Sequence, residues 1–148
     1  MFLLSYLLPS EKLAFAADFQ YNTLVRIFKN SWFSRFARKE GIDDRELQDL
    51  VKQLEAGQSY ADLGGGVFKE CLPRPNEGKS GGFRVIVLFR FAKHTFYVYG
   101  FAKSNTANIS KKELAKLKKQ AKTLFAMTDA QIQAAIKESI FEEIEGES

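Results

Sequence analysis

Two neighbouring segments with the residue pattern of β-strands constrain the fold of this chain most strongly. Phe83–Phe91 and Thr95–Lys103 are both rich in β-branched and aromatic residues. Only a short stretch around Lys93 and His94 separates them. Two such runs joined by a short loop are typical of an antiparallel hairpin, so we expect a β-sheet built around this pair.

The pairing within this hairpin predicts which side chains share a face. If Ala92 lies opposite Thr95, Arg84 lies opposite Lys103, and directly opposed residues point to the same side of the sheet. One face would then carry aromatic and cationic side chains, with Arg90 opposite Tyr97, Leu88 opposite Tyr99, Ile86 opposite Phe101 and Arg84 opposite Lys103. The other face is apolar throughout, which predicts a core.

The remaining pattern predicts an α+β fold in the order β-α-α-β-β-β-α-α. In this fold a small antiparallel sheet is covered on one face by an N-terminal helical hairpin and C-terminal helices. The elements expected beside the hairpin are a strand over Leu24–Phe28, a helix from Asn30 or Ser31 to Gly41, a helix from the Asp43–Glu46 capping box to Gly57, a strand over Val67–Leu72 stopped by Pro73 and Pro75, a helix opened by the Ser110–Glu113 capping box, and a last helix from Thr128 to about Ser139.

The 148 residues are expected to form one domain over residues 25–140. Residues 1–24 are interpreted as an extension outside it, consistent with a start of translation near Val25, and residues 141–148 as an acidic, solvated tail. The apolar start ends at Pro9, far short of the roughly 20 residues of a membrane span, and it lacks the basic region of a signal peptide. The one cysteine, Cys71, cannot form an internal disulfide, which fits a reducing cytoplasm.

Positive charge gathers in one part of the chain. Val67–Lys122 contains 13 Lys or Arg against three acids, a local charge of +10, whereas the whole chain is only +4. These cations are spaced through aromatic strands and a Gly-rich segment. A folded surface of this kind favours a polyanion, and RNA is the first candidate.

Several familiar catalytic and phosphate-binding sites do not fit the sequence. A phosphate-binding P-loop at Gly78–Gly82 fails, because its first glycine would fall at Pro73. As a flexible turn it could still hold a backbone phosphate with Lys79, or be an ordinary hairpin turn. The single histidine, His94, is interpreted as an exposed turn residue, so serine triads and zinc hydrolases lack their histidines. Neither four metal-spaced Cys or His residues nor paired carboxylates in the basic segment are found.

Phosphodiester chemistry would therefore depend on Lys, Arg and Tyr. RNA permits this, because its own 2′-OH is an internal nucleophile. Arginine stabilises the charge that develops at phosphorus, and a lysine among other cations can exchange protons. From the residues alone, both an RNA-binding surface and a nuclease remain open.

Three short segments together resemble the RelE/ParE toxin superfamily in its HigB-like branch. They are Asp62–Lys69 (DLGGGVFK), Gly78–Arg84 (GKSGGFR) and Phe96–Lys103 (FYVYGFAK). Arg26–Lys29 before Trp32, the helical hairpin and the closing helix from Ser110 also fit, so the resemblance covers about residues 25 to 140.

The resemblance implies a toxin of a type II toxin–antitoxin system that cuts mRNA in the ribosomal A site, without metal or cofactor. By position, Lys69 matches a proton-transfer lysine, Arg84 the arginine that stabilises the transition state, and Lys103 a lysine at the end of the last strand. The residues interpreted as RNA-binding are Arg74, Lys79, Arg90, Tyr97, Tyr99 and Phe101, the aromatic ones being equally interpretable as sheet packing.

The chain departs from the family pattern at two positions. Some RelE members have Arg where this chain has Ser104 and Tyr where it has Ser110, so base stacking and proton transfer by that tyrosine must fall to another group. The alternatives are a ParE-like gyrase poison and a non-catalytic RNA- or ribosome-binding protein. The expected partner is a cognate antitoxin with a helix-turn-helix fold.

Overall fold

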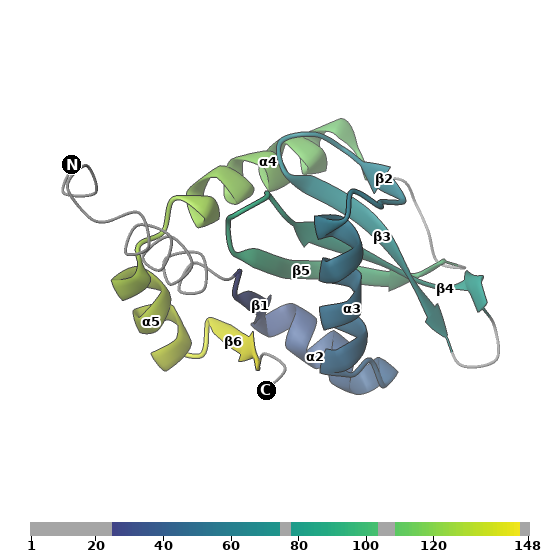
Figure 1. Cartoon of the computed structure of the whole chain (residues 1–148), viewed down its shortest axis with the longest axis horizontal. Helices are drawn as coiled ribbons and strands as arrows, with labels where there is room; N and C mark the ends of the chain where they lie inside the picture. Colours follow the sequence, from purple (N-terminus) through teal and green to yellow (C-terminus); the bar gives the residue numbers. More distant parts are fainter. Residues whose placement is uncertain (1–24, 75–77, 104–108, 146–148) are drawn as a thin grey trace, which may run out of the picture.

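The computed structural model describes residues 25–74, 78–103 and 109–145. The elements in chain order are β1 (Ile27–Asn30), α2 (Ser31–Glu40), α3 (Asp44–Glu55), β2 (Ala61–Asp62), β3 (Val67–Arg74), β4 (Gly78–Leu88), β5 (Thr95–Ala102), α4 (Lys111–Phe125), α5 (Asp129–Lys137) and β6 (Phe141–Ile144). The strands form one sheet in the order β2-β3-β4-β5-β1-β6 (Figure 1). The expected α+β class is confirmed.

The helices begin where the sequence predicts. Asn30 caps α2 by accepting the Phe33 N–H, and Gly41 ends that helix in the left-handed conformation. Each of the other three described helices has a complete capping box at its start, formed by Asp43–Glu46, Ser110–Glu113 and Thr128–Gln131. These boxes satisfy backbone N–H groups that have no partner inside the helix. In the described residues, no helix is both long and apolar enough to cross a membrane.

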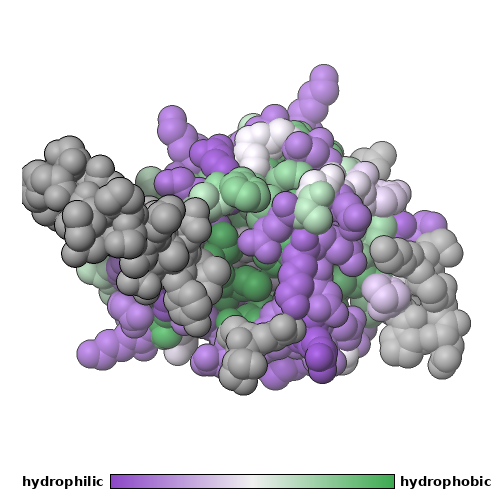
Figure 2. Space-filling model, viewed as in Figure 1, coloured by the Kyte–Doolittle hydropathy of each residue, from purple (hydrophilic) through white to green (hydrophobic). Residues whose placement is uncertain are grey.

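The sheet differs from the expectation in its pairing and in its covering. β1 runs parallel to β5 and antiparallel to β6, so the sheet is mixed rather than wholly antiparallel. Apolar side chains of α2 and α3 pack on one face, and those of α4 and α5 pack on the other. β4 carries apolar side chains on both of its faces. The helices therefore cover both faces of the sheet rather than one. Figure 2 shows polar side chains along α3, with apolar ones beside it over β5 and β1.

The expectation of a solvated acidic tail was wrong for Phe141–Ile144, which form β6. Phe141 and Ile144 are buried, one on each face of the sheet. Both Glu143 carboxylate oxygens accept hydrogen bonds from Arg26, at 2.8 Å each. This hydrogen bond lowers the pKa of Glu143. The acidic residues of this segment therefore attach the last strand to β1.

The hairpin register differs from the prediction by two residues as far as Ile86 and by three residues beyond it. Arg84 pairs with Phe101 rather than with Lys103, and Ile86 pairs with Tyr99. Between Ile86 and the next residue of β4 the register shifts, which leaves Val98 as an extra residue in β5. Such a β-bulge changes which residues of a strand share a face.

Strand ends also differ from the sequence-based bounds. β3 continues through Pro73 to Arg74 with a register irregularity at the proline, which has no N–H to donate. The glycine-rich run Gly78–Gly82 is the beginning of β4 rather than a flexible turn. β4 ends at Leu88, earlier than predicted.

The turn before β5 encloses the histidine more than expected. His94 is half-buried, and its Nδ1 accepts the Arg26 N–H at 3.2 Å. Its ring meets the Phe28 ring edge-on. Burial, followed by the neighbouring Arg26 charge, lowers the pKa of His94. The prediction of an exposed turn residue was therefore wrong.

The turn before β3 needs glycine because α4 packs directly upon it. Gly66 has a φ of +84°, and a Cβ added there would lie 2.6 Å from the Phe125 ring. At Gly65, a Cβ would lie 2.9 Å from the stem of Lys118. The close approach fixes α4 against the start of β3.

Candidate functional site

A cleft of about 560 Å³ opens beside the outer edge of β3. β2 pairs with β3 only at Lys69 and Phe68, so the rest of this edge is not covered by β2. The α3–β2 segment and α3 border one side of the cleft, and strands β3, β4 and the end of β5 border the other. Its lining residues are Gln53, Gln58, Ser59, Tyr60, Glu70, Cys71, Arg84 and Lys103.

Arg84 is the buried cation of this cleft. Its side chain is only 6% exposed, and its strand places it between Cys71 of β3 and Phe101 of β5. The guanidinium carbon lies 5.1 Å from the centre of the Tyr60 ring. Lys103 is exposed and lines the same cleft. The structure thus brings Arg84 and Lys103 together, although the predicted direct pairing was wrong.

Lys69 lies beside the cleft on the same face of the sheet. It pairs with Ile86, and Cys71 two residues later pairs with Arg84. Directly paired residues share a face, and diagonal neighbours are roughly 7–8 Å apart. Lys69 is half-buried and also pairs with Ala61 of β2. The three predicted catalytic residues therefore belong to one region of the molecule.

A buried carboxylate fixes the opposite wall of the cleft. Glu70 is 3% exposed, and both of its oxygens accept the Tyr60 N–H, at 3.0 and 3.1 Å. A buried charge is costly unless it is hydrogen-bonded. These bonds hold the backbone of Tyr60 where its ring covers Arg84. The sequence interpretation missed Tyr60, since only the folded chain brings it to the guanidinium.

An aromatic stack continues from the cleft toward α2. Tyr99 is 46% exposed and shares the Arg84 face through its pairing with Ile86. Its ring stacks on Trp32 with the centres 4.5 Å apart, and it lies 6.0 Å from Phe101. Trp32 itself is 37% exposed. Its aromatic type was the only signal in the sequence.

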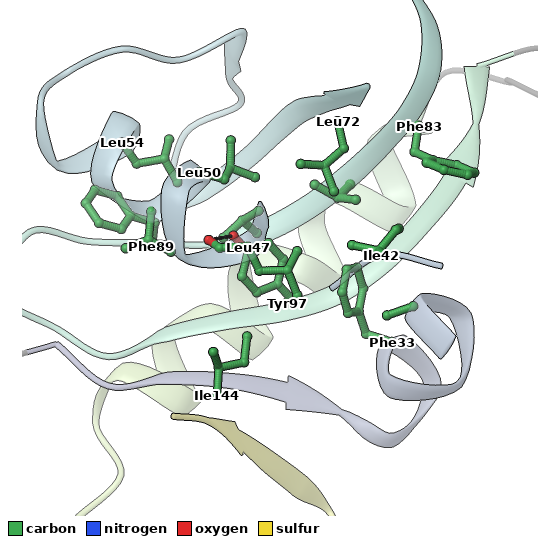
Figure 3. Packing of buried hydrophobic residues seen from close by; sticks show 14 residues of the cluster. Phe33, Ile42, Leu47, Leu50, Leu54, Leu72, Phe83, Phe89, Tyr97 and Ile144 are labelled. Atoms are coloured by element: carbon green, nitrogen blue, oxygen red, sulfur yellow. Dashed lines mark hydrogen bonds between the residues drawn. The ribbon is translucent and has the colours of Figure 1, made fainter. Parts of the chain in front are cut away.

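The assignment of Tyr97 to the RNA-facing surface was wrong. Tyr97 is fully buried in the cluster between the sheet and the hairpin of α2 and α3. Its hydroxyl donates to the Leu47 carbonyl at 2.7 Å, as Figure 3 shows. Burial, followed by the charge of Glu70, raises the pKa of Tyr97 well above its ordinary value. The Val98 bulge turns Tyr97 to this face while Tyr99 stays on the other.

The other predicted RNA-binding residues lie away from the cleft or beyond what is described. Arg90 is exposed past the opposite end of β4, where its guanidinium lies 4.9 Å from the Phe125 ring. The backbone of Arg74 pairs with Gly78 at the distal end of β3 and β4. The side chains of Arg74 and Lys79 lie outside the described residues, as does Ser104. Ser110 is the α4 cap that the sequence predicted.

Among the described elements, α4 carries the most cationic side chains. Six lysines of this helix are exposed, namely Lys111, Lys112, Lys116, Lys118, Lys119 and Lys122. Among the described residues, no three His, Cys, Asp or Glu side chains gather into a group that could hold a metal ion. The side chains of the cleft that can carry charge or exchange protons are those of Tyr60, Glu70, Cys71, Arg84 and Lys103.

Comparison with known proteins identifies a family for the chain. A family model for the RelE toxin of the RelE/RelB toxin–antitoxin system matches residues 25–144. No curated protein matches the chain. The match includes β6, the strand that the sequence interpretation had placed outside the domain. It implies an antitoxin partner. Because the match covers most of the 148 residues, the chain belongs to the RelE toxin family.

Proposed function

We propose that this protein is a ribosome-dependent mRNA endonuclease that inhibits translation as the toxin of a type II toxin–antitoxin pair. The observation that carries the proposal is the buried Arg84 guanidinium in a cleft that Lys103 also lines. A cation held in a partly desolvated site stabilises developing negative charge more strongly than one in water.

The reaction uses the RNA itself as the nucleophile. The 2′-oxygen attacks the adjacent phosphorus, the bond to the 5′-oxygen breaks, and the products are a 2′,3′-cyclic phosphate and a 5′-hydroxyl. The phosphorane between them carries extra negative charge. Arg84 binds its oxygens through the N–H groups of the guanidinium, whose carbon lies over the Tyr60 ring.

Two lysines complete the site in this proposal. Lys69, on the same face of the sheet as Arg84, accepts the proton of the 2′-OH and later releases it to solvent, while water supplies the proton that the departing 5′-oxygen takes up. Lys103 lies at the end of the hairpin and neutralises the phosphate backbone of the bound strand. The exposed lysines of α4 contact ribosomal RNA, where they supply affinity that falls as salt rises.

The partner and location follow from the same proposal. The antitoxin is a helix-turn-helix protein that covers the basic surface or blocks access to the ribosome. A substrate bound to translating ribosomes places the toxin in the cytoplasm. We assign the toxin to the HigB-like branch on the three segments that carry the sequence resemblance.

Cell-free translation with purified variants tests the proposal. The wild-type protein should cut the translated mRNA, and Arg84→Ala should lower the cleavage rate about 100-fold or more, because it removes a preorganised donor. Arg84→Lys keeps the charge but not the planar fork, and should restore little. Arg45→Ala is the control, since Arg45 is an exposed arginine of α3 that does not line the cleft and should change little.

Each variant is checked for folding by thermal unfolding, because Arg84 is buried. Folded Arg84→Ala that cuts mRNA at the wild-type rate would contradict the proposal. Intact mRNA together with inhibition of gyrase supercoiling would favour a ParE-like poison instead.

A further inference from the structure

Tyr60 occupies an unusual position for a large aromatic side chain. It is 60% exposed, yet its ring lies over the buried Arg84 guanidinium at 5.1 Å. Its backbone N–H is held by both oxygens of Glu70, a carboxylate that is itself buried. The chain therefore uses a buried charge to fix an exposed ring at the mouth of the cleft.

The exposed side of this ring is suited to a planar ligand. One face of the ring is against the guanidinium, and the exposure of the residue leaves area for contact from the solvent side. A nucleobase stacks on an aromatic ring regardless of its identity, because every base has a π-face. Single-stranded RNA is recognised largely through such stacking on splayed bases.

The two other described tyrosines and Ser110 are engaged elsewhere in the fold. Ser110 is committed to capping α4, where its hydroxyl accepts the Glu113 N–H at 3.1 Å. Tyr97 is buried in the core, and Tyr99 stacks against Trp32 on the α2 side. Of the described tyrosines, Tyr60 is the one whose ring lies directly on Arg84.

We propose that Tyr60 is the base-stacking residue of this site: a nucleobase of the bound RNA stacks on its outer face, and the neighbouring phosphate is thereby placed at Arg84. This inference rests on the proposed endonuclease function and adds the residue that positions the substrate. Glu70 is the positioning residue for Tyr60, since both of its carboxylate oxygens accept the tyrosine backbone N–H.

The test compares three substitutions of Tyr60 in ribosome-dependent cleavage. Tyr60→Ala removes the ring and should lower kcat/KM roughly 5- to 150-fold, the range of one base–aromatic stack. Tyr60→Phe keeps the ring and should retain most of the activity, which a role for the hydroxyl would not predict. Tyr60→Leu keeps an apolar cover over Arg84 without a π-face and should behave like Tyr60→Ala. Phe91→Ala, which removes a 73% exposed ring in the hairpin turn, is the matched control and should have no effect.

A second readout detects the stack itself. The probe is a ribosome carrying mRNA with 2-aminopurine at one position of the A-site codon at a time and a 2′-O-methyl group at the scissile position. Stacking quenches 2-aminopurine, so the wild-type protein and Tyr60→Phe should quench one position, and Tyr60→Ala should not.

The possible outcomes separate this inference from the proposed function. Unchanged kcat/KM and unchanged quenching in Tyr60→Ala would overturn the role of Tyr60 and leave the endonuclease proposal standing. Loss of activity in both Tyr60→Ala and Tyr60→Phe would overturn stacking in favour of the hydroxyl. A wild-type protein that never cuts translated mRNA would overturn the endonuclease proposal and, with it, the role of Tyr60.

Discussion

Replacing Tyr97 with Phe tests whether this residue belongs to the core or to the RNA surface. The ring stays in place in the substitution, so no large cavity forms around it. The change removes the hydroxyl that donates to the Leu47 carbonyl at 2.7 Å. That carbonyl lies within α3 and keeps its helical partner, the Val51 N–H.

The expected loss follows from these contacts. Because no buried acceptor is left wholly without a partner, the free energy of unfolding should fall by about 1 kcal/mol, the net value of one hydrogen bond. RNA cleavage should be unchanged, since Tyr97 is fully buried on the face that packs against α3.

Alkaline pH should reverse the sign of this difference. In the folded protein the pKa of Tyr97 is raised, chiefly because of burial. The stability that the buried neutral tyrosine contributes is therefore complete below its ordinary pKa and is lost as pH rises above that value. The unfolded chain ionises with a pKa of about 10, which costs the wild type about 1.4 kcal/mol at pH 11. Phe cannot ionise, so Tyr97→Phe escapes this loss and should be the more stable protein by about 0.4 kcal/mol at pH 11.

Urea unfolding of the two proteins at about pH 8 and about pH 11 measures both differences, because the other ionisable groups are common to both. A stability difference that is the same at both pH values would refute the buried, hydrogen-bonded placement. Loss of mRNA cleavage in a well-folded Tyr97→Phe would refute it as well.

Three further changes have defined outcomes. Gly66→Ala combines a positive φ with a Cβ only 2.6 Å from the Phe125 ring of α4. It should therefore destabilise the protein more than Gly57→Ala, where φ is +80° but nothing lies within 4 Å of the added Cβ. Equal losses of stability in urea unfolding would argue against close packing of α4. Glu143→Gln weakens the paired hydrogen bonds to Arg26 and should cost about 0.5–1 kcal/mol at neutral pH. Because the pKa of Glu143 is lowered, that cost should disappear as pH falls below about 4, and a cost that persists in acid would contradict the ion pair. Cys71 is the single cysteine and lines the cleft, so its alkylation should block mRNA cleavage. The same reagent should leave the activity of Cys71→Ser unchanged. Full activity of the alkylated protein would place the reaction elsewhere.

Local signals in the sequence predicted which segments form helices and strands, but not how all of these elements pair and pack. The capping boxes at Asp43, Ser110 and Thr128 are short-range patterns, and each one forms as expected. The hairpin was also expected, but its register depends on the bulge at Val98, which no glycine marks. That bulge separates Tyr97 from Tyr99, although residues two apart normally share a face.

The tail was misjudged for a related reason. Its acidic residues look solvated in the sequence, because their partners Arg26, just before β1, and Ser34, in α2, lie more than 100 positions away in the chain. Phe141 and Ile144 become core residues only when β1 offers an edge to pair with. Short-range patterns do not report such long-range strand pairing.

The candidate site also contains residues that could be predicted from the sequence and one that could not. Arg84, Lys69 and Lys103 were predicted from the sequence resemblance, and the fold gathers them in one region through the pairing of β3 with β4 and the path of β5. Tyr60 was not predicted, because its place over Arg84 depends on the Glu70 carboxylate and on the return of the chain after α3. Residues supplied by loops from outside the sheet therefore required the structure.

Mapping of mRNA 5′ ends after brief induction tests the central claim most directly. The account predicts new ends within translated codons for the wild-type protein, their disappearance when translation is blocked, and their absence in folded Arg84→Ala. New ends that persist without translation, or that appear equally with Arg84→Ala, would contradict a ribosome-dependent endonuclease built around the Arg84 cleft.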